Sequence, residues 1–139
     1  YCATCDGAFY CNAEVVVVGM CREAVEEAQH LTKFASTVHW ITHKDPKVDD
    51  RHAQDLLQEM NVRHWSKTRM LSIEGDESGV TGVTLQAHNH ETTQELRVEG
   101  VFIYVAGSKP ITDFLQGGDV EVKPDGGVLV NDEMATSAA

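Results

Sequence analysis

The chain has 139 residues, enough for one domain with a hydrophobic core, and 42% of them are hydrophobic, as is normal for a soluble globular protein. Its 22 acidic residues outnumber its 11 basic ones and give a formal net charge of -11, which repels nucleic acid and anionic membranes, so we expect neither as a partner. No apolar run approaches the ~20 residues needed to span a bilayer, and no signal-peptide pattern is present.

The first half of the chain alternates predicted strands with predicted helices. The β-branched run Glu14–Val18 is typical of a parallel strand that is buried on both faces. Apolar residues at three- and four-residue spacing predict helices that follow it. The expected order is a strand at Glu14–Val18, a helix at Arg22–Phe34, a strand at Thr37–Ile41, a helix at Asp50–Met60 and a strand at Val62–Trp65. This β-α-β-α-β order indicates a parallel sheet with helices packed on it.

The pattern then changes to strict alternation of apolar and polar residues. Thr68–Ile73, Val80–Ala87 and Thr92–Val98 alternate in this way, and turn residues separate them, so they predict an antiparallel meander. The apolar run Val101–Val105 predicts a return to the parallel sheet. The expected fold class is therefore α/β, a Rossmann-like parallel sheet with flanking helices and an antiparallel β-meander.

The last stretch differs from the rest and divides the chain. We expect one domain over residues 1–110 and a second segment over residues 111–139, with a helical turn near Phe114 and a strand at Val128–Val130. The chain begins at Tyr1 rather than Met and ends soon after its last predicted strand. We therefore expect it to be a piece of a longer protein.

All four cysteines lie in the first 21 residues, a crowding that predicts specialised thiols in a cytoplasmic protein rather than a secreted disulfide scaffold. Cys2 and Cys5 are separated by two small residues, so they can close a disulfide within one helical turn. A helix N-terminus at this position would lower the thiol pKa, and Asp6 could then donate or accept a proton. Half a zinc site and inert buried thiols are the alternatives. Because Cys11 and Cys21 complete no second C-x-x-C, we expect no metal site.

The segment Tyr1–Gly7 resembles the active-site signature of low-molecular-weight thioredoxin reductases, which are pyridine nucleotide-disulfide oxidoreductases. The resemblance continues in order through Val15–Gly19, Ala24–Ala28, Leu31–Ser36, Gly100–Ile103 and Asp132–Met134. It implies a nicotinamide-binding domain inserted into a FAD-binding domain, with residues 111–139 as the start of the return, and a homodimer. It also implies that Cys5 faces the flavin, Cys2 attacks the disulfide of thioredoxin, and Asp6 is the acid.

The expected nucleotide site departs from the family in two places. Dinucleotide turns follow the pattern Gly-x-Gly-x-x-Gly or Ala; Gly19 and Ala24 fit it, but Cys21 replaces the second glycine, and its Cβ would crowd a pyrophosphate. The family reads the 2′-phosphate with His-Arg-Arg-x-x-x-Arg, and here His43 and Lys44 are followed by two carboxylates that repel phosphate, Asp45 and Asp49. Lys47 and Arg51 would compensate in part.

These departures predict weak or absent NADPH binding and leave three electron donors open, namely NADPH, NADH and ferredoxin. An acidic residue after the second strand could hold the ribose of NADH. Ferredoxin-dependent flavin thioredoxin reductases, which the chain resembles in its degraded nicotinamide motifs, suggest the third donor. At Gly107, relatives bring a glycine close to the nucleotide, although ending a strand is its simplest role. A non-catalytic interaction domain is the remaining alternative, and the intact pair of Cys2 and Cys5 argues against it.

Overall fold

The computed structural model describes residues 2–88, 91–104, 118–124 and 127–138. The chain divides into two compact units, Tyr1–Ala106 and Gly107–Ala139. The predicted helical turn near Phe114 lies outside the described residues. No helix in the part of the chain that the structure describes is long and apolar enough to cross a membrane.

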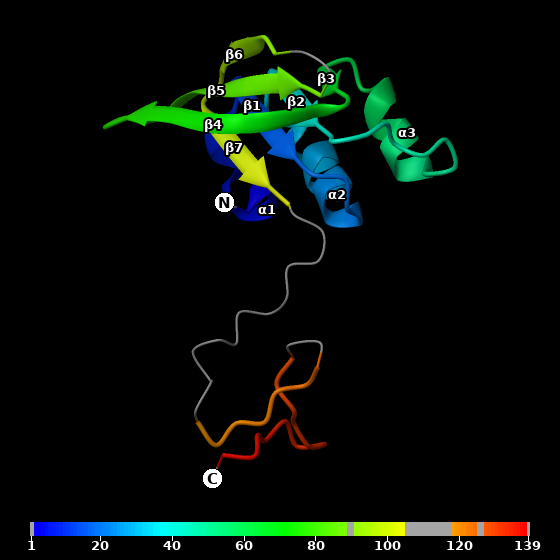
Figure 1. The fold of residues 1–139 in the computed structure, drawn as a ribbon, viewed down its shortest axis with the longest axis vertical. Coiled ribbons are helices and arrows are strands. Elements are labelled where there is room, and N and C mark those ends of the chain that lie inside the picture. Colours follow the sequence, from blue (N-terminus) through cyan, green and yellow to red (C-terminus); the bar gives the residue numbers. More distant parts are fainter. Residues whose placement is uncertain (1, 89–90, 105–117, 125–126, 139) are drawn as a thin grey trace. The chain divides into compact units, whose positions relative to one another are not determined.

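Four parallel strands form the main sheet of the first unit (Figure 1). They are β1 (Glu14–Val18), β2 (Thr37–Ile41), β3 (Val62–Trp65) and β7 (Gly100–Ile103), in the order β3-β2-β1-β7. Three of these strands have the predicted bounds, whereas β7 begins one residue earlier than the predicted Val101 and ends at Ile103, before the predicted Val105. The central strand β1 pairs with β2 on one side and with β7 on the other, and its residues Val15, Val16 and Val17 are buried.

The helices are α1 (Ala3–Asp6), a 3₁₀ turn η1 (Gly7–Tyr10), α2 (Arg22–Leu31) and α3 (Arg51–Gln58). The helix α2 ends three residues before the predicted Phe34, because the amides of Lys33 and Phe34 bond to carbonyls three residues back and tighten the last turn. The helix α3 begins where Asp50 accepts a hydrogen bond from the amide of Ala53 at 3.2 Å, an N-cap interaction.

The predicted meander is a separate three-stranded antiparallel sheet. It consists of β4 (Thr68–Asp76), β5 (Gly79–Ala87) and β6 (Thr93–Arg97), in chain order. The strand β4 extends three residues beyond the predicted Ile73, because the hairpin closes tightly at Gly79, which has a φ of +122°. The carboxylate of Asp76 supports this turn by accepting from the amide of Ser78 at 2.8 Å.

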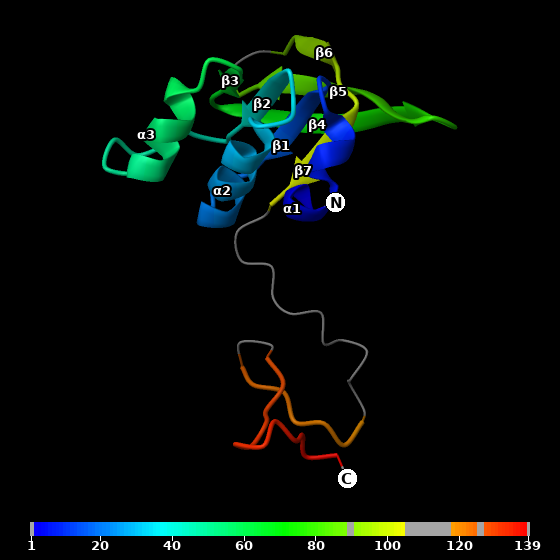
Figure 2. The same ribbon diagram turned by 180° about the vertical axis from the view of Figure 1, so that it is seen from behind.

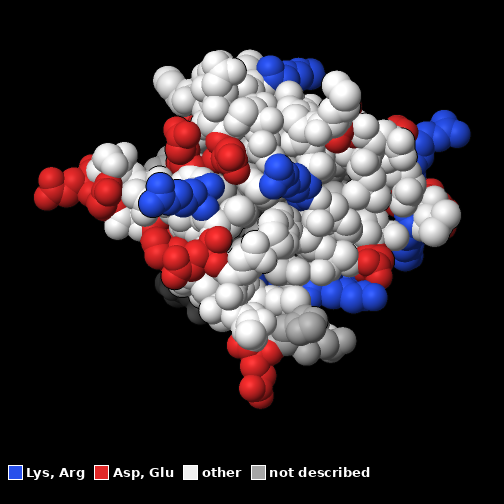
Figure 3. Space-filling view, turned by 90° about the horizontal axis from the view of Figure 1, so that it is seen from above, with Lys and Arg blue, Asp and Glu red and all other residues white. Residues whose placement is uncertain are grey.

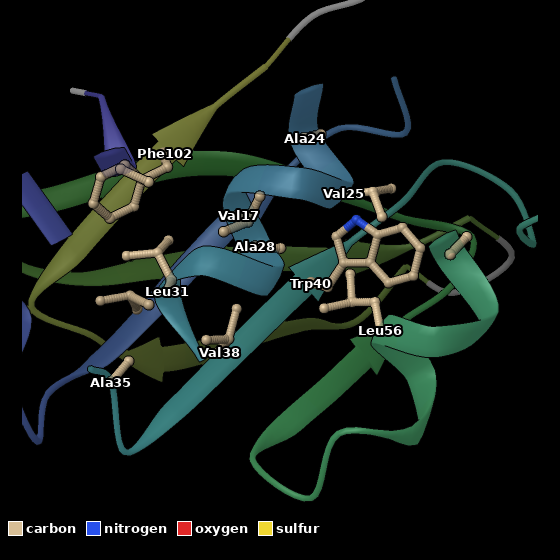
Figure 4. Close-up of a cluster of buried hydrophobic side chains, with 13 residues drawn as sticks. Val17, Ala24, Val25, Ala28, Leu31, Ala35, Val38, Trp40, Leu56 and Phe102 are labelled. Atoms are coloured by element: carbon tan, nitrogen blue, oxygen red, sulfur yellow. The ribbon is translucent and has the colours of Figure 1, made fainter. Parts of the chain in front are cut away.

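The elements form three layers, with the helices on one face of the parallel sheet and the meander on the other (Figures 1 and 2). Alternate residues of the central strands therefore enter two different cores. Val15, Val17 and Trp40 belong to the core under the helices, where Leu31 and Leu56 also lie (Figure 4). Val16, Ile41 and Val101 point the other way, and they pack in one cluster with Val83 and Leu85 of the meander. The expected fold class is confirmed in all its parts.

In the second unit, the described residues 118–124 and 127–138 contain much less regular structure than the first unit. Val122 and Val128 form an isolated antiparallel bridge, supported by a 2.8 Å bond from the amide of Leu129 to the carbonyl of Glu121. The predicted strand at Val128–Val130 is therefore wrong in extent. Three apolar residues in a row suggested a strand, but the residues that the structure describes here form only one bridge.

Candidate functional site

The two cysteines of the Cys2-Ala3-Thr4-Cys5 motif lie on one short helical turn. Cys2 is the N-cap of α1, and its carbonyl accepts from the amides of Cys5 at 3.1 Å and Asp6 at 2.8 Å. Both side chains are exposed and both thiols are free, and the two thiols hydrogen-bond to each other. The arrangement can close a disulfide and can also present either sulfur to a partner from solvent.

Other side chains occupy the amide groups at the start of α1. The Tyr104 hydroxyl, at the end of β7, accepts from the amide of Ala3 at 3.3 Å. Glu27 of α2 holds Thr4 with both carboxylate oxygens, one accepting from the amide and the other from the hydroxyl, each at 2.9 Å. The Asp6 carboxylate accepts from the amide of Cys2 at 3.2 Å.

The expected lowering of the thiol pKa is wrong for Cys5. The pKa of Cys5 is raised above its ordinary value of 9.0, chiefly by its hydrogen bond to the Cys2 thiol and by the charge of Cys2, with smaller contributions from burial, Asp6 and Glu27. The expectation relied on amide groups that would face a thiolate. In the structure these groups bond to Tyr104 and Glu27, and the charges of Asp6 and Glu27 oppose a second negative charge.

The two alternative interpretations of the cysteines were half a zinc site and inert buried thiols. Cys11 is exposed and Cys21 is half-buried, and neither is joined to Cys2 or Cys5. Among residues 2–88, 91–104, 118–124 and 127–138, no group of three or more His, Cys, Asp or Glu side chains could hold a metal ion. The exposure of Cys2 and Cys5 differs from the inert, buried thiols of the other alternative.

A cleft of about 750 Å³ lies where β1 meets α2, and we call it the β1–α2 cleft. Gly19, at the turn between these elements, has a φ of +140°, and a Cβ placed there would lie 2.1 Å from the carbonyl oxygen of Tyr104. Only glycine fits such a position without displacing the backbone. Of the predicted nucleotide residues, Gly19, Cys21, His43 and Lys44 line this cleft, and Ala24 is fully buried beside Gly19.

The structure shows what Cys21 does in place of the second glycine. It is the N-cap of α2 with an extended φ of -69°, so its backbone needs no glycine. Its thiol lies 3.9 Å from the carbonyl oxygen of Tyr104 and packs against the core under the helices. The predicted crowding of a pyrophosphate by Cys21 remains a prediction.

Asp45 lies outside the lining of the cleft, and the predicted repulsion of a phosphate by its carboxylate remains a prediction. Its carboxylate accepts a hydrogen bond from Ser66 and forms a 3.0 Å ion pair with Lys67. These contacts lower the pKa of Asp45, Ser66 more than Lys67, so the carboxylate stays ionised and paired. The cations that line the cleft are Lys44, Lys47 and Arg69 of β4, and the last of these was not predicted from the sequence.

Asp49 also lies outside the lining of the cleft. The one carboxylate within the lining is that of Asp50, which is engaged in capping α3. Figure 3 shows the face above β4, β5 and β6, where basic side chains lie apart from one another among acidic ones. Predicted Gly107 lies outside the described residues.

Sequence reasoning missed four residues that shape these two regions. Tyr104 and Glu27 hold α1, Arg69 adds a charge to the cleft, and Trp40 donates from its indole nitrogen to the carbonyl of Gly19 at 2.8 Å. The first of these contacts joins residues 101 positions apart in the chain. Of these four residues, only Trp40 could have been found from the sequence. It lies near the end of a predicted buried strand, which predicts a position beside the turn that follows the neighbouring strand.

Comparisons with known proteins agree with this geometry. The thioredoxin reductase of Aquifex aeolicus is 36% identical over 142 residues, which cover 99% of this chain and 42% of that protein. The solved thioredoxin reductase of Gloeobacter violaceus is 62% identical with a TM-score of 0.76, covering 99% of this chain and 42% of that one. A ferredoxin-flavin thioredoxin reductase from Clostridium acetobutylicum is 29% identical with a TM-score of 0.60, covering 98% of this chain and 41% of that one.

The chain thus spans less than half the length of these relatives. The sequence pattern of the family described as "Pyridine nucleotide-disulphide oxidoreductase" matches residues 1–139, the whole chain. The resemblance stated from the sequence is confirmed by this match and by the thioredoxin reductases among the relatives. The chain belongs to the pyridine nucleotide-disulphide oxidoreductase family.

Proposed function

We propose that Cys2 and Cys5 perform dithiol–disulfide exchange as part of a thioredoxin reductase, with thioredoxin as the protein that receives the electrons. The observation that carries the proposal is the placement of two exposed, hydrogen-bonded thiols on one turn of α1. A pair of this geometry can alternate between a disulfide and a dithiol with little movement of the backbone. The names of the relatives support thioredoxin as the partner.

The exchange proceeds through a mixed disulfide. The Cys2 thiolate attacks one sulfur of the thioredoxin disulfide, a bond forms between the two proteins, and the other thioredoxin sulfur leaves as a thiolate. The Cys5 thiolate then attacks Cys2, closes the Cys2–Cys5 disulfide and releases the second thioredoxin sulfur. Two electrons and two protons pass to thioredoxin, and Asp6, which is bonded to the Cys2 amide, is the proposed group that exchanges a proton with the leaving sulfur.

The electrons that regenerate the dithiol would be supplied by FAD, which the family implies and for which we assign no residues of this chain. We further propose that the β1–α2 cleft binds the nicotinamide dinucleotide. The absence of a side chain at Gly19 supports this, and so do three cations along the cleft, Lys44, Lys47 and Arg69. Asp45 lies outside the lining of the cleft and pairs with Lys67, which reduces its repulsion of a phosphate there.

The proposed exchange is tested by trapping the mixed disulfide. A Cys5→Ser variant keeps the attacking thiol and lacks the one that resolves the mixed disulfide. The partner is a thioredoxin in which one active-site cysteine is serine and the other is activated as a mixed disulfide with thionitrobenzoate. The Cys2 thiolate should attack this mixed disulfide, release thionitrobenzoate and form a covalent complex that dithiothreitol reduces. Cys11→Ser is the matched control, since Cys11 is also exposed but lies outside the pair. A complex that forms through Cys11, or no complex with Cys5→Ser, would overturn the proposal.

The proposed cleft is tested by calorimetric titration of NADPH, and then NADH, into the chain. Binding that weakens in the Lys44→Gln and Arg69→Gln variants supports the cleft as the nucleotide site. Absence of binding by both nucleotides, together with a dithiol that still exchanges with thioredoxin, would instead favour ferredoxin as the electron donor.

A further inference from the structure

The turn that carries the two cysteines is held from two directions. Glu27 reaches it from α2 and Tyr104 reaches it from the end of β7, and each accepts a hydrogen bond from a backbone amide of α1. Both side chains are half-buried, whereas Thr4 and the two cysteines are exposed. The amides of Ala3 and Thr4 therefore already have partners before any thiolate forms.

This arrangement changes the relative stability of the two redox states. In dithiol motifs whose thiolate is stabilised by helix amides, the reduced form is favoured, and the disulfide is a strong oxidant. Here the amides of Ala3 and Thr4 are committed to Tyr104 and Glu27. The carboxylate of Glu27 also brings a negative charge to the same turn, which disfavours a thiolate and leaves the disulfide relatively stable.

We propose that Glu27 and Tyr104 are positioning residues that tune the Cys2–Cys5 pair to be a strong reductant, by withholding the α1 amides from the thiolates and, in the case of Glu27, by adding a negative charge. This proposal rests on the proposed function in one respect, namely that the Cys2–Cys5 pair alternates between the disulfide and the dithiol. The charged groups that act on Cys5, namely Cys2, Asp6 and Glu27, are all negative, and they raise its pKa. Burial is the largest influence on Tyr104 and raises the pKa of its hydroxyl, so it remains a neutral acceptor for the Ala3 amide.

The test is the equilibrium between the chain and dithiothreitol. One dithiothreitol sulfur attacks the Cys2–Cys5 bond, and its second sulfur resolves the mixed disulfide. Two electrons and two protons thereby move to the cysteines, and dithiothreitol becomes a cyclic disulfide. The fraction of dithiol is measured by alkylation and mass spectrometry across buffers of different reduced-to-oxidised ratio, at pH 7 and at pH 10, because the Cys5 thiolate forms only at alkaline pH.

Glu27→Gln removes the charge and should raise the equilibrium constant for reduction about threefold at pH 10, and much less at pH 7. It should also lower the pH at which Cys5 becomes half alkylated. Tyr104→Phe frees the Ala3 amide and should shift the constant in the same direction. Glu26→Gln is the matched control, because Glu26 is the adjacent residue of α2 and pairs with Arg22 at 2.6 Å instead of with α1.

The salt dependence of the redox equilibrium distinguishes a charge effect from a looser attachment of α1. The difference between the wild-type chain and Glu27→Gln should shrink in about 1 M KCl, where the Debye length is near 3 Å. Equal shifts in Glu27→Gln and Glu26→Gln, or a shift toward the disulfide, would overturn the inference. If the Cys2–Cys5 disulfide forms normally but neither Glu27→Gln nor Tyr104→Phe shifts its equilibrium, this inference fails and the proposed function stands. A chain that never forms this disulfide overturns the proposed function as well.

Discussion

Replacing Gly19 with alanine tests how closely the turn between β1 and α2 is fitted to the end of β7. The new Cβ would lie 2.1 Å from the carbonyl oxygen of Tyr104 and 3.0 Å from the Cβ of Ala24, while the backbone stays at a φ of +140°. The unfavourable backbone conformation costs about 1–3 kcal/mol for a residue with a side chain. The contact with Tyr104 adds a further cost typical of overpacking, about 1–3 kcal/mol.

The backbone on both sides of this contact is held in place, which is why relaxation cannot remove the whole cost. The amide of Tyr104 donates to the carbonyl of Val18 at 2.8 Å, and the carbonyl of Gly19 accepts from the indole of Trp40, also at 2.8 Å. Moving either chain segment away from the new methyl group would stretch one of these bonds. We therefore expect Gly19→Ala to lower the free energy of unfolding by about 2–6 kcal/mol, the sum of the two terms.

Gly79→Ala is the matched control, and the assay is urea denaturation followed by tryptophan fluorescence. Gly79 also has a positive φ, +122°, but no atom lies within 4 Å of the position of its missing Cβ. It should lose only the backbone term, about 1–3 kcal/mol. The reasoning is refuted if the two variants lose the same free energy to within about 0.5 kcal/mol, since their difference isolates the contact with Tyr104.

Three further predictions concern the same unit. Trp40→Phe should destabilise the chain by about 2–4 kcal/mol in urea denaturation, because it leaves a cavity in the core and removes the bond to Gly19; a loss below about 1 kcal/mol would contradict this. Burial, opposed by Asp45, holds the pKa of His64 below its ordinary 6.5. In the unfolded chain His64 therefore takes up a proton at a higher pH than in the folded chain. Stability that is present above pH 6.5 should be lost as the pH falls toward the folded pKa. The loss of stability between pH 7.5 and 5.5 should be smaller in His64→Gln, and equal losses in the two proteins would count against this explanation. Arg69→Gln should weaken NADPH binding about three- to tenfold in calorimetry, whereas Asp45→Asn should change it less than about twofold. A larger effect of Asp45→Asn than of Arg69→Gln would show that the cleft is misassigned.

The strands were predictable because their apolar pattern reflects burial directly. Val15, Val16 and Val17 are all fully buried, so a continuous β-branched run could only be a central strand covered on both faces. Element ends were less predictable, since local bonds decide them. The last turn of α2 is tightened by amide bonds to carbonyls three residues back, and β4 continues until the hairpin at Gly79.

The placement of Cys2 and Cys5 on one helical turn was predictable, and their surroundings were much less so. The spacing of Cys2 and Cys5 places two thiols on one turn whatever the rest of the chain does. The pKa of Cys5 is raised chiefly by Cys2 and also by Glu27, and Glu27 is distant in sequence and meets α1 only in the folded chain. The same holds for Asp45, whose ion pair with Lys67, a residue that follows the next strand, could not be predicted from the sequence.

The central claim is that Cys2 and Cys5 are the redox-active pair, and the pairing of cysteines after mild oxidation tests it most directly. Chymotrypsin cleaves after Phe9 and Tyr10, so it separates Cys2 and Cys5 from Cys11 and Cys21. The account predicts a disulfide between Cys2 and Cys5 that forms first and is reversed by dithiothreitol, while Cys11 and Cys21 remain free to alkylate. A first disulfide that includes Cys11 or Cys21, or four thiols that resist oxidation together, would contradict the account.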